Sequence, residues 1–151
     1  EQNFSHAEKL HVFIEELLTE NQLKFSDLNA IAVSQGPGSY TGLRIGVSSA
    51  KGFCYALNIP MIAIDTLQLL AKQIEIEEGV IIPMIDARRM EVFTAFYDKN
   101  YNQIRNTQAE IIDETSYQEI TDTIHLVGDG TEKFKNTLTA QMLNFNSDAS
   151  A

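Results

Sequence analysis

The sequence of 151 residues has one cysteine, no tryptophan and no long apolar run. A single cysteine, Cys54, excludes an internal disulfide and is typical of a reducing compartment. No apolar stretch approaches the roughly 20 residues that a membrane-spanning helix requires, and no basic, apolar leader opens the chain. We therefore expect a soluble, cytoplasmic protein that does not associate with membranes.

Basic side chains are also scarce, with 11 Lys and Arg against 21 Asp and Glu and a formal net charge of −10. Affinity for nucleic acid comes largely from Lys and Arg side chains that neutralise phosphates. The basic residues are scattered, and Arg88-Arg89 is their only adjacent pair. The composition therefore predicts that any RNA is contacted mainly through partner proteins.

The first half of the chain has the pattern of a small α/β unit. An S-x-x-E capping box at Ser5–Glu8, followed by apolar residues at helical spacing, predicts a helix over 5–19. Short apolar runs at 30–35 and 61–65 lie on either side of a second helix that ends near Leu57, and a third helix over 66–73 follows. This order is typical of a parallel strand–helix–strand unit.

The second half is richer in strands. Apolar and alternating runs predict strands over 80–86, 91–98, 103–112 and 124–127, a short helix near 116–120 and a last helix from Thr131. We expect two α/β lobes, 1–78 and 79–151. The first lobe has only two recognisable strands, too few to cover three helices, so we expect that strands preceding it are absent from this sequence.

Segment 34–46, SQGPGSYTGLRIG, joins a strand to a helix through glycines that permit a tight turn. Its spacing fits neither the dinucleotide fingerprint nor the P-loop, because Gly42 comes one residue late and no lysine follows. Inside the helix, Gly42, Gly46 and Ser49 form a face of small side chains. Glycine in a helix costs roughly 1 kcal/mol against alanine, so this face indicates close approach of another helix, from this chain or from a partner.

The run SQGPGSYTGLRIGVSSAKGFCYALNIPMIAIDTL resembles the TsaB (YeaZ) family, and HAEKLHVFIEELL and MIDARRMEVFTAFYD extend the resemblance over most of the chain. The resemblance implies an actin-like (ASKHA, ribonuclease H-like) two-lobe α/β fold. It also implies a non-catalytic subunit that binds the related catalytic protein TsaD. With the ATPase TsaE, that pair makes threonylcarbamoyladenosine beside the anticodon of tRNAs that read codons beginning with A. The family chain usually begins before and continues beyond this sequence, so the second lobe is also expected to be incomplete.

In that family the helices of the first lobe form the partner interface. Carried onto this sequence, the candidate partner-binding residues are Phe13, Leu17, Tyr40, Gly42, Arg44, Ile45, Gly46 and Ser49. A homodimer that uses the same helix faces is an open alternative.

An actin-like ATPase or phosphotransferase acting alone is the alternative from another class. The resemblance makes Asp86 a candidate contact of the second phosphate loop, and Gly128, Asp129 and Gly130 a candidate adenosine loop, for ATP or ADP with Mg at the lobe interface. Turn chemistry also explains all four residues. His6 and His11 are five residues apart, which places their rings on different helix faces and argues against a metal site. We expect no catalytic residue and no certain cofactor.

Overall fold

The computed structural model describes residues 6–138 and 143–146, and its contacts divide the chain into two compact units. Unit 1 comprises residues 1–35 and 39–64, and unit 2 comprises residues 36–38 and 65–151. The predicted lobe boundary lies at residue 78 and leaves the third helix in the first lobe. The contacts instead assign this helix to unit 2, because it packs on strands of that unit. The lobe boundary itself stays a prediction. In the described residues, no helix has the length and apolar character that crossing a membrane requires.

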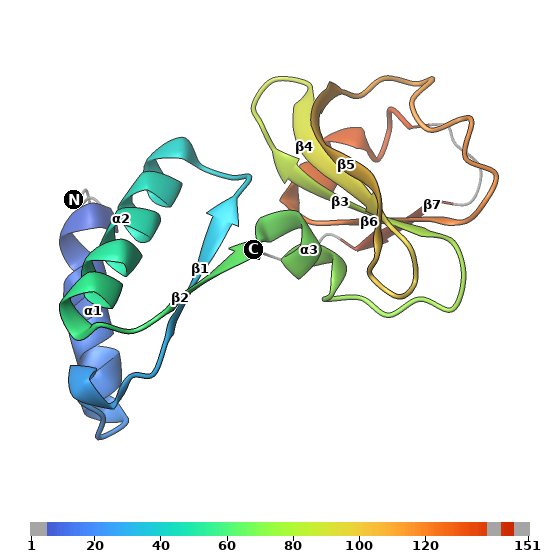
Figure 1. Cartoon of the computed structure of the whole chain (residues 1–151). Coiled ribbons are helices and arrows are strands. Elements are labelled where there is room, and N and C mark those ends of the chain that lie inside the picture. Colours follow the sequence, from blue (N-terminus) through green and yellow to red (C-terminus); the bar gives the residue numbers. More distant parts are fainter. Residues whose placement is uncertain (1–5, 139–142, 147–151) are drawn as a thin grey trace. The chain divides into compact units, whose positions relative to one another are not determined.

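Unit 1 is built from two helices and two strands (Figure 1). Its elements are α1 (His6–Glu20), η1 (Phe25–Asp27), β1 (Ile31–Gly36), α2 (Tyr40–Leu57) and β2 (Met61–Asp65). Ser39 caps α2 by accepting a hydrogen bond of 3.3 Å from the Gly42 amide. Asn58, at a positive φ of 55°, ends the helix, and Pro60 prevents its continuation. The capping box predicted at Ser5 lies partly outside the described residues.

Unit 2 is a five-stranded mixed sheet in the order β5-β4-β3-β6-β7. Its strands are β3 (Val80–Asp86), β4 (Glu91–Tyr97), β5 (Gln103–Ile111), β6 (Ile124–Val127) and β7 (Leu143–Asn146). β4 pairs antiparallel with both β3 and β5, whereas β6 pairs parallel with both β3 and β7. The helix α3 (Thr66–Ala71) and the 3-10 helix η2 (Asp129–Phe134) complete the unit.

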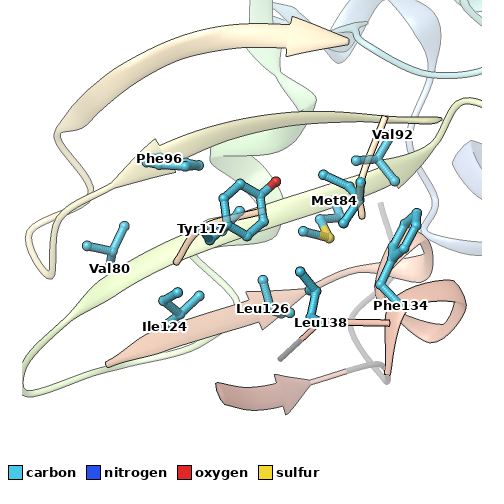
Figure 2. Packing of buried hydrophobic residues seen from close by; sticks show 11 residues of the cluster. Val80, Met84, Val92, Phe96, Tyr117, Ile124, Leu126, Phe134 and Leu138 are labelled. Atoms are coloured by element: carbon cyan, nitrogen blue, oxygen red, sulfur yellow. The ribbon is translucent and has the colours of Figure 1, made fainter. Parts of the chain in front are cut away.

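The central strand β3 has apolar side chains on both faces of the sheet, which is why its sequence is a continuous apolar run. Val80, Ile82 and Met84 belong to one core cluster, together with Phe96, Tyr117 and Phe134. Figure 2 shows this cluster, in which Tyr117 from the segment between β5 and β6 and Phe134 from η2 meet the side chains of the sheet. Ile81 and Ile85 point to the opposite face, where they pack with Leu67 and Leu70 of α3.

Two predicted elements differ from the structure. Residues 116–119 form turns instead of a short helix, because Asp113 Oδ1 accepts a hydrogen bond of 2.8 Å from the Thr115 amide and Tyr117 takes a positive φ of 67°. The helix predicted from Thr131 begins two residues earlier, as the 3-10 helix η2 that ends at Phe134, and its predicted continuation reaches residues outside the described ones.

Candidate partner surface and loop pair

The helix α1 carries large apolar side chains that the described residues of unit 1 leave more than half exposed. The exposed fractions are 56% for Phe13 and 61% for Leu17, and Val12 is half exposed. His11 lies against Phe53 of α2, with 5.4 Å between the ring centroids. Exposed phenylalanine and leucine side by side on one helix are typical of an interaction surface. The predicted partner residues of α1 are therefore accessible.

The first turn of α2 holds a second exposed aromatic residue. Tyr40 is 73% exposed, and the Arg44 guanidinium donates to its hydroxyl at 3.3 Å and lies 5.3 Å from its ring centroid. This pair is one helical turn apart, a spacing that brings side chains together. Further along the same helix, Tyr55 is 92% exposed. Arg44 thus holds the Tyr40 ring in place at the surface.

The small residues of α2 do not share one surface. A Cβ on Gly46 would lie 4.0 Å from Val33 of β1, so Gly46 faces the sheet of its own unit. A Cβ on Gly42 would meet only the Ser39 cap, at 3.5 Å. A Cβ on Gly52, which is not among the predicted partner residues, would meet nothing within 4 Å, and this glycine is exposed. Ile45 is half-buried, so the eight candidates are divided between the outside of the helices and the inside of the unit.

An apolar hollow of about 380 Å³ separates α1, α2 and β1. Gly46 and Ser49 line it, and Leu17 reaches it from α1. Its remaining lining residues are Leu10, Ile14, Leu18, Phe25, Leu28, Ala30, Ile31, Ala32, Val33, Ala50 and Phe53. A volume of this size in a protein interior would normally be filled by side chains. Unit 1 by itself therefore leaves apolar surface exposed on its inside as well as on its outside.

The loops that follow β3 and β6 lie together in unit 2. Parallel strands end at the same edge of a sheet, and β6 pairs with β3 in register from Val80–Ile124 to Pro83–Val127. The Asp86 amide donates to Asp129 Oδ1 at 3.2 Å. The structure thus brings together the predicted nucleotide-binding residues Asp86 and Asp129.

The Asp86 carboxylate already has partners within the chain. Its Oδ1 accepts a hydrogen bond of 2.6 Å from the Arg88 amide and a bond from Lys133 Nζ, which also donates to the Arg89 carbonyl at 2.9 Å. The Lys133 hydrogen bond lowers the pKa of Asp86 below its usual value, more than the partial burial raises it. Sequence reasoning missed Lys133, although it lies just three residues beyond Gly130.

Close packing against Met84 explains why positions 128 and 130 are glycines. Gly128 has a φ of +107°, and a Cβ there would lie 2.5 Å from the Met84 carbonyl oxygen. A Cβ on Gly130 would lie 3.0 Å from several Met84 atoms. Both glycines therefore let the loop after β6 pass directly over β3. Among the described residues, no three His, Cys, Asp or Glu side chains are grouped as a metal site would require.

Comparison with known proteins matches most of the chain to one protein family. A family model described as TsaD, tRNA N6-adenosine threonylcarbamoyltransferase, matches residues 3–147. The tRNA threonylcarbamoyladenosine biosynthesis protein TsaB of Bacillus subtilis is 40% identical over 93 residues, which cover 62% of this chain and 41% of the relative. TsaB of Escherichia coli is 35% identical over 101 residues, covering 66% and 44%. The chain thus matches less than half the length of these two relatives.

Solved structures agree on the fold. The protein described as YeaZ from Pseudomonas aeruginosa has a TM-score of 0.74 with this chain and is 23% identical, with 97% of this chain and 72% of that one covered. A second structure from the same organism, described as similar to peptidase YEAZ, has a TM-score of 0.72 and 24% identity. The predicted α/β, actin-like fold class is confirmed.

Proposed function

Because this chain belongs to the TsaB (YeaZ) family, we propose that it is a scaffold and activator subunit that binds the catalytic TsaD protein. The pair would carry out threonylcarbamoyl modification of the adenosine beside the anticodon of tRNA, in the cytoplasm. The chain would contribute no catalytic residue. Its role would be to stabilise the active form of TsaD.

The observation that carries this proposal is the uncovered apolar surface of unit 1. Phe13, Leu17 and Tyr40 are each more than half exposed, and removing their remaining apolar surface from water stabilises an interface by roughly 25 cal/mol per Å². Aromatic residues that fill a pocket in the partner are the usual binding hot spots. The surface belongs to two adjacent helices, so it fits a helical face of TsaD.

The state of Asp86 favours a scaffold over an ATPase acting alone. A phosphate-loop carboxylate must be available to water or Mg²⁺, whereas Asp86 accepts bonds from Lys133 and from the Arg88 amide. The glycines of the 128–130 loop are packed against Met84. These residues fit ATP or ADP with Mg poorly in this arrangement. Nucleotide binding stays a prediction, which calorimetric titration of Mg-ATP into the full-length protein would test.

The test of the scaffold is complex formation between the full-length protein and TsaD from the same organism, measured by size-exclusion chromatography with light scattering. We expect a complex that Phe13→Glu, combined with Tyr40→Glu, weakens at least tenfold, because two charges would enter an apolar interface. Ile104→Glu is the matched control, since Ile104 is 57% exposed on β5 of unit 2. Absence of a complex at tens of micromolar, with ATP turnover by this chain alone, would overturn the proposal.

The same measurement addresses two further expected partners. A homodimer on the same helix faces would appear as a concentration-dependent mass of this chain alone, and Phe13→Glu would disrupt it too. The ATPase TsaE is expected to join only the preformed pair. Addition of TsaE to each component separately, and then to the mixture, distinguishes these cases.

A further inference from the structure

The connection between β3 and β4 holds two consecutive arginines at positive φ, 74° at Arg88 and 52° at Arg89. Side chains with a Cβ adopt this region at a cost of roughly 1–2 kcal/mol per residue, which is why hairpin turns that need it usually contain Asn-Gly. Both arginines are exposed. A turn built only to reverse the chain would not need them, so their side chains are the reason for their presence.

The turn is held in this strained form by contacts from several directions. The Ala87 amide bonds the Glu91 carbonyl at 3.1 Å, and the Glu91 amide bonds the Arg88 carbonyl at 3.1 Å. Lys133 reaches across from η2 and donates to the Arg89 carbonyl at 2.9 Å and to the Asp86 carboxylate. The turn therefore presents its two side chains from a fixed backbone, which reduces the entropy lost when they bind.

Neither guanidinium forms a hydrogen bond or a close ion pair with any residue that the structure describes, although the Arg88 charge helps to lower the pKa of Asp86. The two carboxylates of the loop pair are engaged elsewhere, because Asp86 pairs with Lys133 and Asp129 accepts from the Asp86 amide. In a chain of net charge −10, this turn carries two consecutive arginines whose side chains are exposed and have no hydrogen-bonded partner among the described residues. Guanidinium groups match phosphate oxygens in geometry and charge.

We propose that Arg88 and Arg89 bind backbone phosphates of the tRNA while the chain is in its complex with TsaD. This inference rests on the proposed function, and it adds a direct RNA contact to a chain that otherwise depends on its partner for RNA binding. The contact is sequence-independent and positions the RNA, because phosphate contacts fix register without reading bases. Two such contacts are too few for binding by this acidic chain alone.

The experiment uses the full-length protein in complex with TsaD and an unmodified tRNA transcript that reads codons beginning with A. The variant is Arg88→Asn together with Arg89→Gly, residues that adopt positive φ without strain. We expect about tenfold weaker tRNA binding near physiological salt, and a slope of log affinity against log salt that is smaller by about 1 per lost contact. We expect the thermal midpoint of this variant to rise, so that lost binding cannot be attributed to unfolding.

Two further variants define the outcome. Arg88→Lys with Arg89→Lys keeps both charges and should retain most of the salt dependence, whereas Lys99→Asn removes a charge from the other hairpin turn of the sheet and should change neither quantity. If the complex forms and the Asn-Gly variant binds tRNA with unchanged affinity and slope, the proposal is wrong. If that variant instead dissociates the complex, the arginines contact TsaD and the RNA contact is also excluded. Failure of the unmodified chain to bind TsaD would reject the proposed function, and this inference with it.

Discussion

The two units of this chain differ in how completely each buries its own apolar side chains. Unit 2 buries tyrosine, phenylalanine, isoleucine, leucine and valine completely on both faces of its sheet. In the described part of unit 1, Ala50 is the one buried hydrophobic residue. Unit 1 instead has exposed aromatic residues outside and an apolar hollow inside.

The difference follows from the number of strands. Five strands give unit 2 two complete sheet faces, and α3 and η2 cover them. Two strands give unit 1 a sheet too narrow to pack against two helices, and a two-stranded sheet is marginally stable by itself. Unit 2 therefore has the interior of an independent folding unit, whereas unit 1 depends on other protein surface for its burial. Mutations should therefore act through stability in unit 2 and through association in unit 1.

The largest expected effect is the loss of a core side chain in unit 2. Phe134 is completely buried in the cluster of Figure 2, so Phe134→Ala should lower the free energy of unfolding by about 3–5 kcal/mol. Phe13→Ala in unit 1 removes the same atoms from a side chain that is 56% exposed, and should cost less than about 0.5 kcal/mol. Urea unfolding of both variants measures the contrast. Equal losses would mean that unit 1 has a core of its own.

Glycine-to-alanine substitutions should change the stability of the two units in opposite directions. Gly128→Ala places a Cβ 2.5 Å from a backbone oxygen at a φ of +107°, and should destabilise unit 2 by at least about 2 kcal/mol. Gly52→Ala in α2 meets nothing within 4 Å, and should stabilise the helix by about 0.5–1 kcal/mol. Thermal unfolding of the two variants checks both signs. A destabilising Gly52→Ala would show that the space beside α2 is filled in solution.

Alkaline pH should lower the free energy of unfolding of unit 2, because the buried Tyr97 then loses its proton more readily in the unfolded chain than in the folded one. Burial, together with the nearby Asp65 carboxylate, raises the pKa of Tyr97 to about 12. Because the unfolded chain loses this proton near pH 10, the contribution of Tyr97 to stability is complete below that pH and is lost as the pH rises toward about 12. Tyr97→Phe should therefore flatten the decline of the unfolding free energy above pH 10. An unchanged decline would exclude Tyr97 as its source.

Four strands of unit 2 could be predicted from the sequence because periodicity and turn residues are local signals, whereas β7 and the strand order were not predicted. The strand over 80–86 was predicted residue for residue, and the 124–127 strand likewise. The helix predicted near 116–120 is wrong because Asp113 Oδ1 accepts a hydrogen bond of 2.8 Å from the Thr115 amide and turns the chain there. Tyr117, at a positive φ of 67°, then packs edge-on against Phe96. The Asp113 turn is a local signal that the prediction did not use, whereas the contact with Phe96 is tertiary.

The candidate site could be predicted in part for a similar reason. Helical spacing gives the angle of Gly46 relative to its neighbours in α2, but it does not say that Val33 of β1 lies at that angle. The parallel pairing of β3 and β6, which the local pattern does not predict, brings Asp86 and Asp129 together, and their nucleotide-binding role stays a prediction. Lys133 was missed because Asp86, the residue that it bonds, lies 47 residues away in the sequence. Spacing predicts faces, and only the fold shows what each face meets.

The smallest expected effect concerns the tie between the two loops of unit 2. Lys133→Met removes the main cause of the lowered pKa of Asp86, which should return toward its ordinary value of 3.8. A lowered carboxyl pKa contributes stability above the unfolded pKa, and that contribution is lost as the pH falls through the folded pKa. The variant should therefore be less stable by under about 1 kcal/mol at pH 7, since the pair is partly exposed and screened by solvent, and its stability should decline less steeply at acid pH.

An NMR titration of the Asp86 carboxyl group measures the shift directly, with Lys135→Met as the matched control because Lys135 pairs with Glu132 on the same segment. The control should leave the pKa of Asp86 unchanged. If Lys133→Met also leaves it unchanged, the carboxylate is held mainly by the Arg88 amide, and the hydrogen bond from the Asp86 amide to Asp129 Oδ1 remains as a tie between the two loops. The loops of unit 2 would then be held together without the ion pair between Lys133 and Asp86.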